Sequence, residues 1–397
     1  MMRTCSALFI QEIMKMEKTN KKRICDRISC FIKGEVVLVV SFVLALISCF
    51  FVKPSAEYAK YIDFRVLAIL IMLMAVVAGM RSIGVFEKLA RALINKVKNV
   101  RQLVLMLVLM CFFSSMFITN DVALITFVPF SIMALSMANR RDKLISLVVL
   151  ETVAANLGSM LTPIGNPQNL FIYTCYEMSL VEFIKIILPY CISSLILIVV
   201  VIFFDKNGKD AIEKISFQEN KENDKYFSLK LAYYIALFIV CIGVVVFKWD
   251  YIICFIAVLV FVAIMNYKLL VKVDYSLIFT FVFFFVFIGN LGNIEIIRTS
   301  LQNTIAGNEM GISILLSQVF SNVPTAMLVS GFTQNYAGLL VGVSIGGLGT
   351  LIASMASLIS YKIYAKEKDA NGFKYLKEFT AVNILFMFIL VVISCIF

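Results

Sequence analysis

Two short polar clusters interrupt apolar stretches of the chain and carry side chains suited to binding small ions. Thr119, Asn120 and Asp121 lie in the middle of the apolar segment 102–138, and Ser321 and Asn322 lie in the middle of segment 311–333. Amide and hydroxyl groups can meet a cation through oxygen or an anion through hydrogen. A polar tip between two apolar arms predicts a re-entrant hairpin, which enters and leaves a membrane by the same side.

A second pair of interruptions falls in two other apolar stretches. Pro163, Gly165 and Pro167 occur within residues 162–169, where two backbone N–H groups are missing and a helix cannot continue undisturbed. The counterpart in the second half is the glycine-rich run 346–350, followed by the small residues 353–357. Unwinding frees carbonyl oxygens for a small cation, and half-helix N-termini present N–H groups and partial positive charge to an anion. Side-chain oxygens and amides for such a site would come from Asn166, Asn169, Ser354 and Ser357.

The alternative to two ion-binding breaks is a pair of proline kinks with packing glycines, as many membrane helices have. That alternative explains a single break well. It explains less well two breaks that are each paired with a polar hairpin tip. We therefore favour a binding site where both tips and both breaks meet.

Two carboxylates fall inside apolar segments and are candidates for proton coupling. Asp121 belongs to the first hairpin tip, and Glu151 lies in the span that leads to the first break. A buried carboxylate without a cationic partner favours its neutral form, so it can take up and release a proton. The alternatives are that Asp121 caps the returning hairpin helix and that Glu151 is a hydrogen-bonded glutamic acid between helices.

The composition places these clusters in a membrane protein. Of 397 residues, 61% are hydrophobic and 15% are charged, and the mean hydropathy is +0.95. A soluble domain of this length cannot bury so much apolar surface, and a nucleic-acid-binding module is excluded. The sequence has no His, which excludes metalloprotease zinc sites and Ser/His catalysis, and its ten Cys show no metal-binding spacing. We expect no enzyme activity.

Nine further apolar runs are long enough to be read as membrane crossings. With the N-terminus on the cytoplasmic side and two re-entrant hairpins, 30 of the 36 Lys and Arg residues fall on the inner side, as the positive-inside rule requires. This threading predicts a multi-pass protein of the plasma membrane with an outer C-terminus. The runs are 36–52, 63–80, 144–161, 183–204, 231–247, 251–266, 274–290, 336–352 and 380–397.

The polar features recur in the same order in two halves of the chain. Asn120 matches Asn322, and Thr162 matches Thr350, while the odd span 231–247 between the halves makes the second half start from the opposite face. Inverted repeats with broken helices are the signature of a secondary transporter. The expected parts are a basic cytoplasmic tail (1–35), a first repeat (36–204) with an inner hairpin (102–138) and a broken helix (144–176), a cytoplasmic linker (205–230), and a linking span with the second repeat (231–397), which holds an outer hairpin (311–333) and a broken helix (336–364).

The fold class predicted is therefore an all-α polytopic membrane protein with inverted repeats, two re-entrant hairpins and two broken transmembrane helices. Three runs make the prediction more specific: ITNDVALITFVP at 118–129, ANLGSMLTPIGNPQN at 155–169 and SNVPTAM at 321–327. These runs resemble those of the ion transporter superfamily, which joins divalent-anion:sodium symporters, citrate transporters, and arsenite or sodium/proton antiporters. The resemblance covers nearly the whole chain beyond the tail.

The resemblance implies a homodimeric, elevator-type carrier whose hairpin tips and broken helices bind sodium and substrate. Carried onto this sequence, the binding residues are Thr119, Asn120, Gly165, Asn166 and Pro167 in the first half, and Ser321, Asn322, Thr325, Ala353 and Ser354 in the second. The dicarboxylate branch has a Ser-Asn-Thr triplet at both tips, whereas this chain has Asp121 and Val323 at the third positions. These departures favour the antiporter-like branch over dicarboxylate binding.

Of the three functions that remain open, we favour the first. The first is an ion-coupled carrier of small anions, the second is a sodium/proton or arsenite-type antiporter of the same fold, and the third is a channel, facilitator or receptor. The charge threading leaves no Lys or Arg at mid-membrane, so the positive charge for an anion should arrive as sodium or as protons. No Walker A motif is present. We expect no cofactor beyond sodium ions at the hairpin tips, and as partners a small anion, sodium or protons, and the lipid bilayer.

Overall fold

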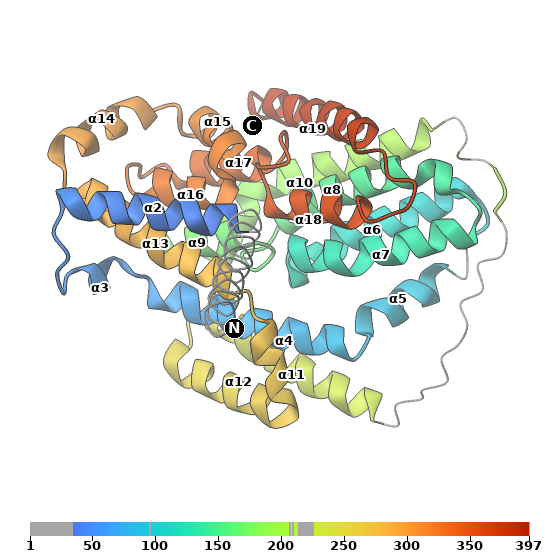
Figure 1. The fold of residues 1–397 in the computed structure, drawn as a ribbon, viewed down its shortest axis with the longest axis horizontal. Helices are drawn as coiled ribbons and strands as arrows, with labels where there is room; N and C mark the ends of the chain where they lie inside the picture. Colours follow the sequence, from blue (N-terminus) through green and yellow to red (C-terminus); the bar gives the residue numbers. More distant parts are fainter. Residues whose placement is uncertain (1–34, 95–96, 206–207, 209, 213–225, 397) are drawn as a thin grey trace, which may run out of the picture.

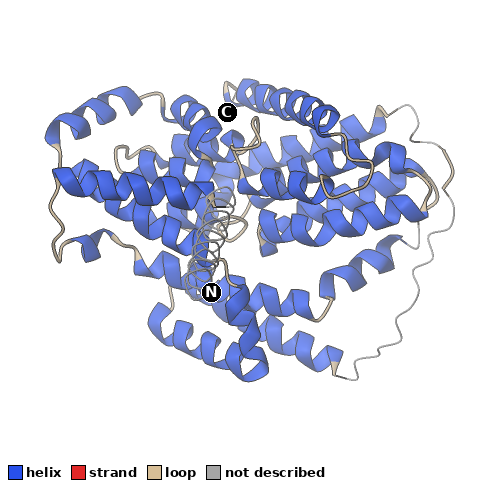
Figure 2. Cartoon of the chain, viewed as in Figure 1, coloured by secondary structure: helices blue, strands red, loops and turns tan. Residues whose placement is uncertain are grey.

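The structure is a computed structural model that describes residues 35–94, 97–205, 208, 210–212 and 226–396 (Figure 1). Within these residues the chain is helical, with an isolated bridge between Asn99 and Ala211 in place of any sheet (Figure 2). The all-helical prediction is confirmed for this part of the chain. The predicted basic tail and most of the predicted linker 205–230 lie outside the described residues.

Most consecutive helices are joined by short connections, whereas most of the segment between α10 and α11 lies outside the described residues. Their bounds are α2 (Val36–Phe51), α3 (Tyr58–Tyr61), α4 (Phe64–Ser82), α5 (Val85–Ile94), α6 (Val100–Ile118), α7 (Asn120–Met137), η1 (Arg141–Lys143), α8 (Leu144–Ser159), α9 (Pro167–Cys175), α10 (Leu180–Phe203), α11 (Phe227–Val246), α12 (Tyr251–Asn266), η2 (Tyr267–Lys272), α13 (Tyr275–Gly292), α14 (Glu295–Ile305), α15 (Glu309–Phe320), α16 (Asn322–Ser330), α17 (Tyr336–Gly346), α18 (Met355–Tyr364) and α19 (Gly372–Ser394).

Capping side chains explain where several of these helices begin. Asp63 accepts a hydrogen bond from the backbone N–H of Val66 at 3.0 Å, and Asp274 accepts one from Leu277 at 3.0 Å. Each satisfies a backbone N–H that has no partner within the helix and places negative charge at its positive end. Helices α4 and α13 therefore start in the same way, one in each half of the chain.

Within the part of the chain that the structure describes, eight helices are long and apolar enough to cross a membrane, which agrees with a polytopic protein. Six of them correspond to expected crossings, and the other two, α6 and α7, are the arms of the expected first hairpin. The remaining expected crossings correspond to the shorter helices α2, α8 and α17. The eight are Phe64–Ser82, Val100–Ile118, Asn120–Met137, Leu180–Phe203, Phe227–Val246, Tyr251–Lys272, Tyr275–Gly292 and Gly372–Ser394.

Each polar tip is a sharp turn between two packed helices. A single residue, Thr119, separates α6 from α7, and a single residue, Ser321, separates α15 from α16. Their φ angles are +67° and +73°, in the region that side chains with a Cβ rarely adopt. The chain therefore reverses within one residue at the same relative place in both halves.

The helices around the expected breaks end where Pro and Gly make continuation difficult. Helix α8 ends at Ser159 and α9 begins at Pro167, while α17 ends at Gly346 and α18 begins at Met355. Pro167 suits the first position of α9 because its missing N–H would have had no helical partner. Two irregular segments, 160–166 and 347–354, thus separate consecutive helices.

Helices from the two halves pack against one another (Figure 1). Helix α9 packs on α16, and α18 packs on both α7 and α8. Helices α10 and α19 lie against α8. Helices α4, α11 and α12 contact one another, and α2 packs along α13. The segments around both tips and both breaks therefore form an interlocked group, with the other helices at its side.

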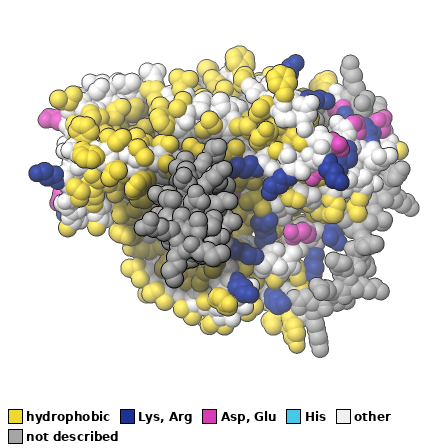
Figure 3. Space-filling model, viewed as in Figure 1, with side chains coloured by type: hydrophobic (Ala, Val, Ile, Leu, Met, Phe, Trp, Pro, Cys, Tyr) yellow, Lys and Arg dark blue, Asp and Glu magenta, His cyan; other side chains and the backbone are white. Residues whose placement is uncertain are grey.

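Charged side chains gather on one part of the surface. In the view of Figure 3, hydrophobic side chains cover the region over α2, α12 and α13, whereas Lys and Arg concentrate toward α5 and the turn between α7 and α8. Apolar residues on α2, α10, α12 and α19 are widely exposed, including Phe50 at 83%. Such faces are typical of helices that contact lipid.

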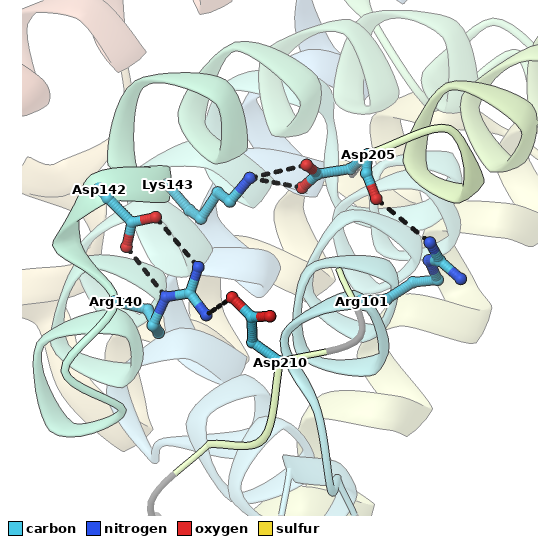
Figure 4. A network of polar contacts seen from close by, with 6 residues as sticks. All are labelled: Arg101, Arg140, Asp142, Lys143, Asp205 and Asp210. Atoms are coloured by element: carbon cyan, nitrogen blue, oxygen red, sulfur yellow. Dashed lines mark hydrogen bonds and ion pairs between the residues drawn. The ribbon is translucent and has the colours of Figure 1, made fainter. Parts of the chain in front are cut away.

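A cluster of ion pairs, which we call the charged clasp, joins the bases of α6, α7 and α10 (Figure 4). Arg140 pairs with Asp142 at 3.0 Å and with Asp210 at 2.9 Å. The hydrogen bond from Arg140 holds the pKa of Asp142 below its usual range. The clasp consists of Arg101, Arg140, Asp142, Lys143, Asp205 and Asp210.

Candidate binding site between the helix hairpins

The first hairpin tip is tied to the first break through Asn120. This residue is 4% exposed, and its backbone N–H donates to the carbonyl of Gly165 at 3.2 Å. Gly165 also lies close to the end of α8, because a Cβ there would lie 2.0 Å from the carbonyl oxygen of Ser159. The irregular segment 160–166 is therefore packed against the end of α8 and hydrogen-bonded to the tip.

The second tip makes the corresponding contact with the second break. The backbone N–H of Asn322 donates to the carbonyl of Ala353 at 2.9 Å. Asn322 is 5% exposed and Ser321 is 1% exposed. The hydroxyl of Thr325 donates to the carbonyl of Ser321 at 2.8 Å, within the start of its own helix. Thr325 thus supports the tip, and its hydroxyl hydrogen is already engaged.

A second contact also recurs in both halves. The hydroxyl of Thr162 donates to the carbonyl of Met116, and the hydroxyl of Thr350 donates to the carbonyl of Gln318 at 3.1 Å. Met116 and Gln318 each stand three residues before their tip residue. The pairing of Thr162 with Thr350 and of Asn120 with Asn322, which the sequence suggested, therefore corresponds to matching hydrogen bonds.

Amide side chains bind several of the carbonyls that unwinding exposes. The Nδ2 of Asn169 donates to the carbonyls of Met160 at 3.0 Å and Thr162 at 3.1 Å. In the second half, the Nε2 of Gln318 donates to those of Gly346 and Leu348, both at 3.0 Å. Asn169 was expected from the sequence, whereas Gln318 was not. Both hold an irregular segment in shape, and the Oδ1 of Asn169 is buried without a hydrogen-bond partner among the described residues.

Asn156 connects the first tip with the second break, a role that the sequence analysis missed. Its Oδ1 accepts hydrogen bonds from Asn120 Nδ2 and from Ser354 Oγ, both at 3.0 Å. Its Nδ2 donates to Ser357 Oγ at 3.2 Å. The only signal in the sequence was a single amide in the apolar helix α8, five residues after Glu151. Asn120 and Ser354, both predicted site residues, therefore meet through Asn156.

A cavity of about 610 Å³ opens beside the first tip and between the interlocked group and its neighbours. The predicted site residues in its lining are Thr119, Asp121, Asn166 and Pro167. The predicted residues of the second half, Ser321, Asn322, Ala353 and Ser354, lie outside this lining, although Met355 contributes. Charged residues from the adjoining helices complete the wall: Arg81, Glu87, Lys272 and Asp274.

Asp121 presents a carboxylate to this cavity. Its Oδ1 is buried and has no hydrogen-bond partner in the described part of the chain. Asp274, which lines the same cavity from the start of α13, interacts electrostatically with it. Asp121 also lies in the first turn of α7, where negative charge is favoured by the helix dipole. The arrangement leaves one carboxylate oxygen available to a proton, a cation or a hydrogen-bond donor.

Glu151 lies deeper, between α7 and α8. It is completely buried, and one oxygen accepts a hydrogen bond from the hydroxyl of Ser131. Its Oε2 has no hydrogen-bond partner among the described residues. Glu151 does not line the 610 Å³ cavity. Within the described residues, no group of three or more Cys, Asp or Glu side chains is placed to hold a metal ion.

Comparison with known proteins adds independent information. A family model described as "Citrate transporter" matches residues 28–339. An uncharacterized transporter of Methanocaldococcus jannaschii is 34% identical over 310 residues, covering 77% of this chain and 83% of that protein. Inner membrane protein YbiR of Escherichia coli is 28% identical over 312 residues, covering 76% and 80%. Silicon efflux transporter LSI3 of Oryza sativa subsp. japonica is 30% identical over 156 residues, covering 39% and 30%.

Proposed function

The chain belongs to the citrate transporter family of membrane transporters, and we propose that it is a secondary active carrier of small anions. The observation that carries the proposal is the 610 Å³ cavity, which brings Thr119, Asp121, Asn166 and Pro167 together beside a helix start and a hairpin tip. The relatives named above are transporters or membrane proteins. We propose further that transport is coupled to sodium or protons.

The two halves of the proposed carrier are inverted repeats. Asn120 with Gly165 and Asn322 with Ala353 form the same hydrogen bond, which supports two equivalent hairpin-and-break units. In this proposal α6–α7 and α15–α16 are re-entrant hairpins, and α8–α9 and α17–α18 are broken transmembrane helices. Irregular backbone at membrane depth is tolerated there because the amides of Asn169 and Gln318 satisfy its carbonyls.

We propose that the site is exposed to the two sides of the membrane in turn because two groups of helices move relative to one another. The interlocked group around both tips would move as one body against α2, α4, α11, α12 and α13, in the manner of an elevator. Among the residues that line the cavity, Arg81, Lys272 and Asp274 are exposed at the protein surface. At Arg65, Tyr173 and Lys248 the remaining space is only about 20 Å³. In the proposed topology Arg81 and Lys272 lie on the cytoplasmic side, which supports a conformation that is open toward the cytoplasm.

The cavity offers groups for an anion and for its coupling cation. Helices α7 and α9 both begin at its wall, so their N-termini favour negative charge. Arg81 and Lys272 add positive charge to the wall, which Glu87 and Asp274 offset, and the carboxylate of Asp121 suits sodium or a proton. No Lys or Arg is expected at mid-membrane, so in this proposal helix N-termini and a coupling ion supply the positive charge that an anion needs. We propose that the carrier acts as a homodimer in the plasma membrane.

A substrate panel in proteoliposomes tests this function. Uptake of candidate anions is measured under imposed sodium or proton gradients, with Asn120→Ala and Asn322→Ala as site variants. We expect uptake to follow one of the two gradients and both variants to lose it while remaining folded. Flux that ignores both gradients and responds only to the solute's own gradient would contradict the proposal and favour a facilitator or channel.

A sodium/proton or arsenite-type antiporter is the second candidate function. The specific observation in its favour is Asp121, which lines the cavity at a tip where the dicarboxylate branch has a hydroxyl, and whose buried Oδ1 has no hydrogen-bond partner among the described residues. A carboxylate at this place disfavours a dianionic substrate and favours a cation, a proton or a neutral hydroxylated solute. In the same proteoliposomes, proton movement driven by sodium alone, without any anion, would identify this alternative.

A further inference from the structure

A groove runs between α10 and α17, apart from the proposed transport site. It consists of two adjoining cavities of about 600 and 380 Å³, which share Lys185, Ile186 and Ala337. None of the residues that line these cavities lines the 610 Å³ cavity beside Thr119. The groove is therefore a separate feature, and an inference from it does not depend on which solute is transported.

Both parts of the groove are lined mainly by apolar surface, and most of its polar side chains lie at the end where α10 and α17 begin. Helix α10 starts after its N-cap Ser179, and α17 starts after its N-cap Asn335. Both caps lie at the polar end, together with Gln334 and Tyr336. The other end is lined largely by apolar residues, Ile186, Pro189, Met310, Ala337 and Val341 among them. The two helices thus start at one end of the groove and run beside its apolar part.

The polar end is fixed by one hydrogen bond across the groove. The hydroxyl of Tyr336 donates to Glu182 Oε1 at 2.6 Å, so the charge of Glu182 already has a donor. Lys185 is exposed and forms no ion pair within the described residues. It is the sixth residue of α10, which places it about 8 Å along the helix from its start. That depth corresponds to the boundary between headgroups and acyl chains when α10 spans the bilayer.

We propose that the groove binds one phospholipid, with its phosphate at Lys185 and an acyl chain along Ile186, Pro189 and Val341. In a bilayer, an apolar groove on the protein surface takes up lipid chain, because an empty space forfeits dispersion contacts on both sides. The phosphate is the anion available at this depth, and a lysine near the membrane surface attracts it. Charge and polarity therefore follow the order of a phospholipid from head to tail.

Native mass spectrometry of the full chain in mild detergent tests this proposal. After delipidation, phosphatidylglycerol or diacylglycerol is added back, and bound lipid per protein is counted. We expect wild type to retain one phosphatidylglycerol and little diacylglycerol. Lys185→Ala should weaken retention about fivefold, whereas Lys185→Arg should keep it. Ala337→Leu fills the shared part of the groove and should displace the lipid while Lys185 is intact.

Lys53→Ala is the matched control for the loss of a lysine side chain at the groove. Lys53→Ala removes an exposed lysine that lines neither cavity, and it should retain lipid as wild type does. Size-exclusion profiles and thermal unfolding check that each variant is folded. Equal retention in wild type, Lys185→Ala and Ala337→Leu would overturn the proposal. Displacement of the lipid by millimolar inorganic phosphate would also overturn it, since the site would then be one for free phosphate.

Discussion

Asn156 is the residue through which the two halves of the candidate site meet. Its amide holds Asn120 from the first tip and both Ser354 and Ser357 from the segment around the second break. Each buried group that loses its partner costs about 1–3 kcal/mol. A substitution here therefore acts on the geometry of two remote segments, whether or not Asn156 touches the transported solute.

We predict that Asn156→Ala lowers the free energy of unfolding by about 2 kcal/mol and reduces uptake at least tenfold. Thermal unfolding and proteoliposome uptake measure the two effects. Asn383→Ala is the matched control, because Asn383 is equally buried but its Nδ2 donates to Phe379 within its own helix. Equal uptake by the two variants would contradict a connecting role for Asn156.

Asp121 provides the second test at the scale of single residues. Asp121→Asn replaces the orphan carboxylate oxygen with a neutral amide of nearly the same shape. If protons couple transport, the pH dependence of uptake should flatten; if sodium does, the half-saturating sodium concentration should rise with little change in pH dependence. Asp250→Asn, at the exposed cap of α12, is the control. Unchanged responses to both ions would remove Asp121 from the coupling mechanism.

Among the structural elements, the charged clasp links the ends of the first hairpin that lie away from its tip. Arg101 of α6 donates to the carbonyl of Asp205 at the end of α10, at 3.2 Å. Lys143, in the α7–α8 turn, makes two contacts of 2.7 Å with the Asp205 carboxylate. Surface ion pairs contribute modestly, but a network that holds several segments contributes more than an isolated pair. The clasp should keep the two arms of the hairpin together while the tip moves with its group.

The clasp predicts an acid-sensitive contribution to stability. The pKa of Asp142 is lowered from 3.8 mainly by its hydrogen bond from Arg140, so its stabilisation is present above that ordinary value and is lost as pH falls through the lowered one. Thermal unfolding should show that Asp142→Asn is destabilised relative to wild type at neutral pH by less than about 1 kcal/mol. This difference in stability should vanish at a pH below the lowered pKa of Asp142. A difference that grows on acidification would contradict this assignment.

The sequence predicted the turns and helix ends better than the contacts between them. Some features act on the backbone next to them, so their effect can be predicted from the sequence. These are the polar clusters at 119–121 and 321–322, and Pro with Gly at 162–169. Asn156 and Gln318 disturb nothing locally. Their importance comes from partners far along the chain, such as Ser354 for Asn156, 198 residues away. A single amide in an apolar helix does not reveal which neighbour it will face.

For the whole molecule, the orientation in the membrane follows from the distribution of charge. We predict that Ala56→Cys is labelled by an impermeant thiol reagent in intact cells, and that Asp369→Cys is labelled only after the membrane is opened. Both positions are exposed in the structure, and all ten native Cys residues are replaced by Ser in the background. Labelling of Asp369→Cys from outside would reverse the topology.

Alternating access makes a stronger demand, because one group of helices must move past another. Arg81 at the end of α4 donates to the carbonyl of Ile125 in α7 at 3.4 Å, across the proposed boundary. A short, reducible bifunctional thiol reagent joining Arg81→Cys to Ile125→Cys should stop transport, and reduction should restore it. The same reagent joining Arg141→Cys to Glu367→Cys, whose native side chains pair at 2.7 Å within the interlocked group, should leave transport running. If both links inhibit equally, the interlocked group does not move as a single body; if neither does, the boundary between α4 and α7 is not where access alternates.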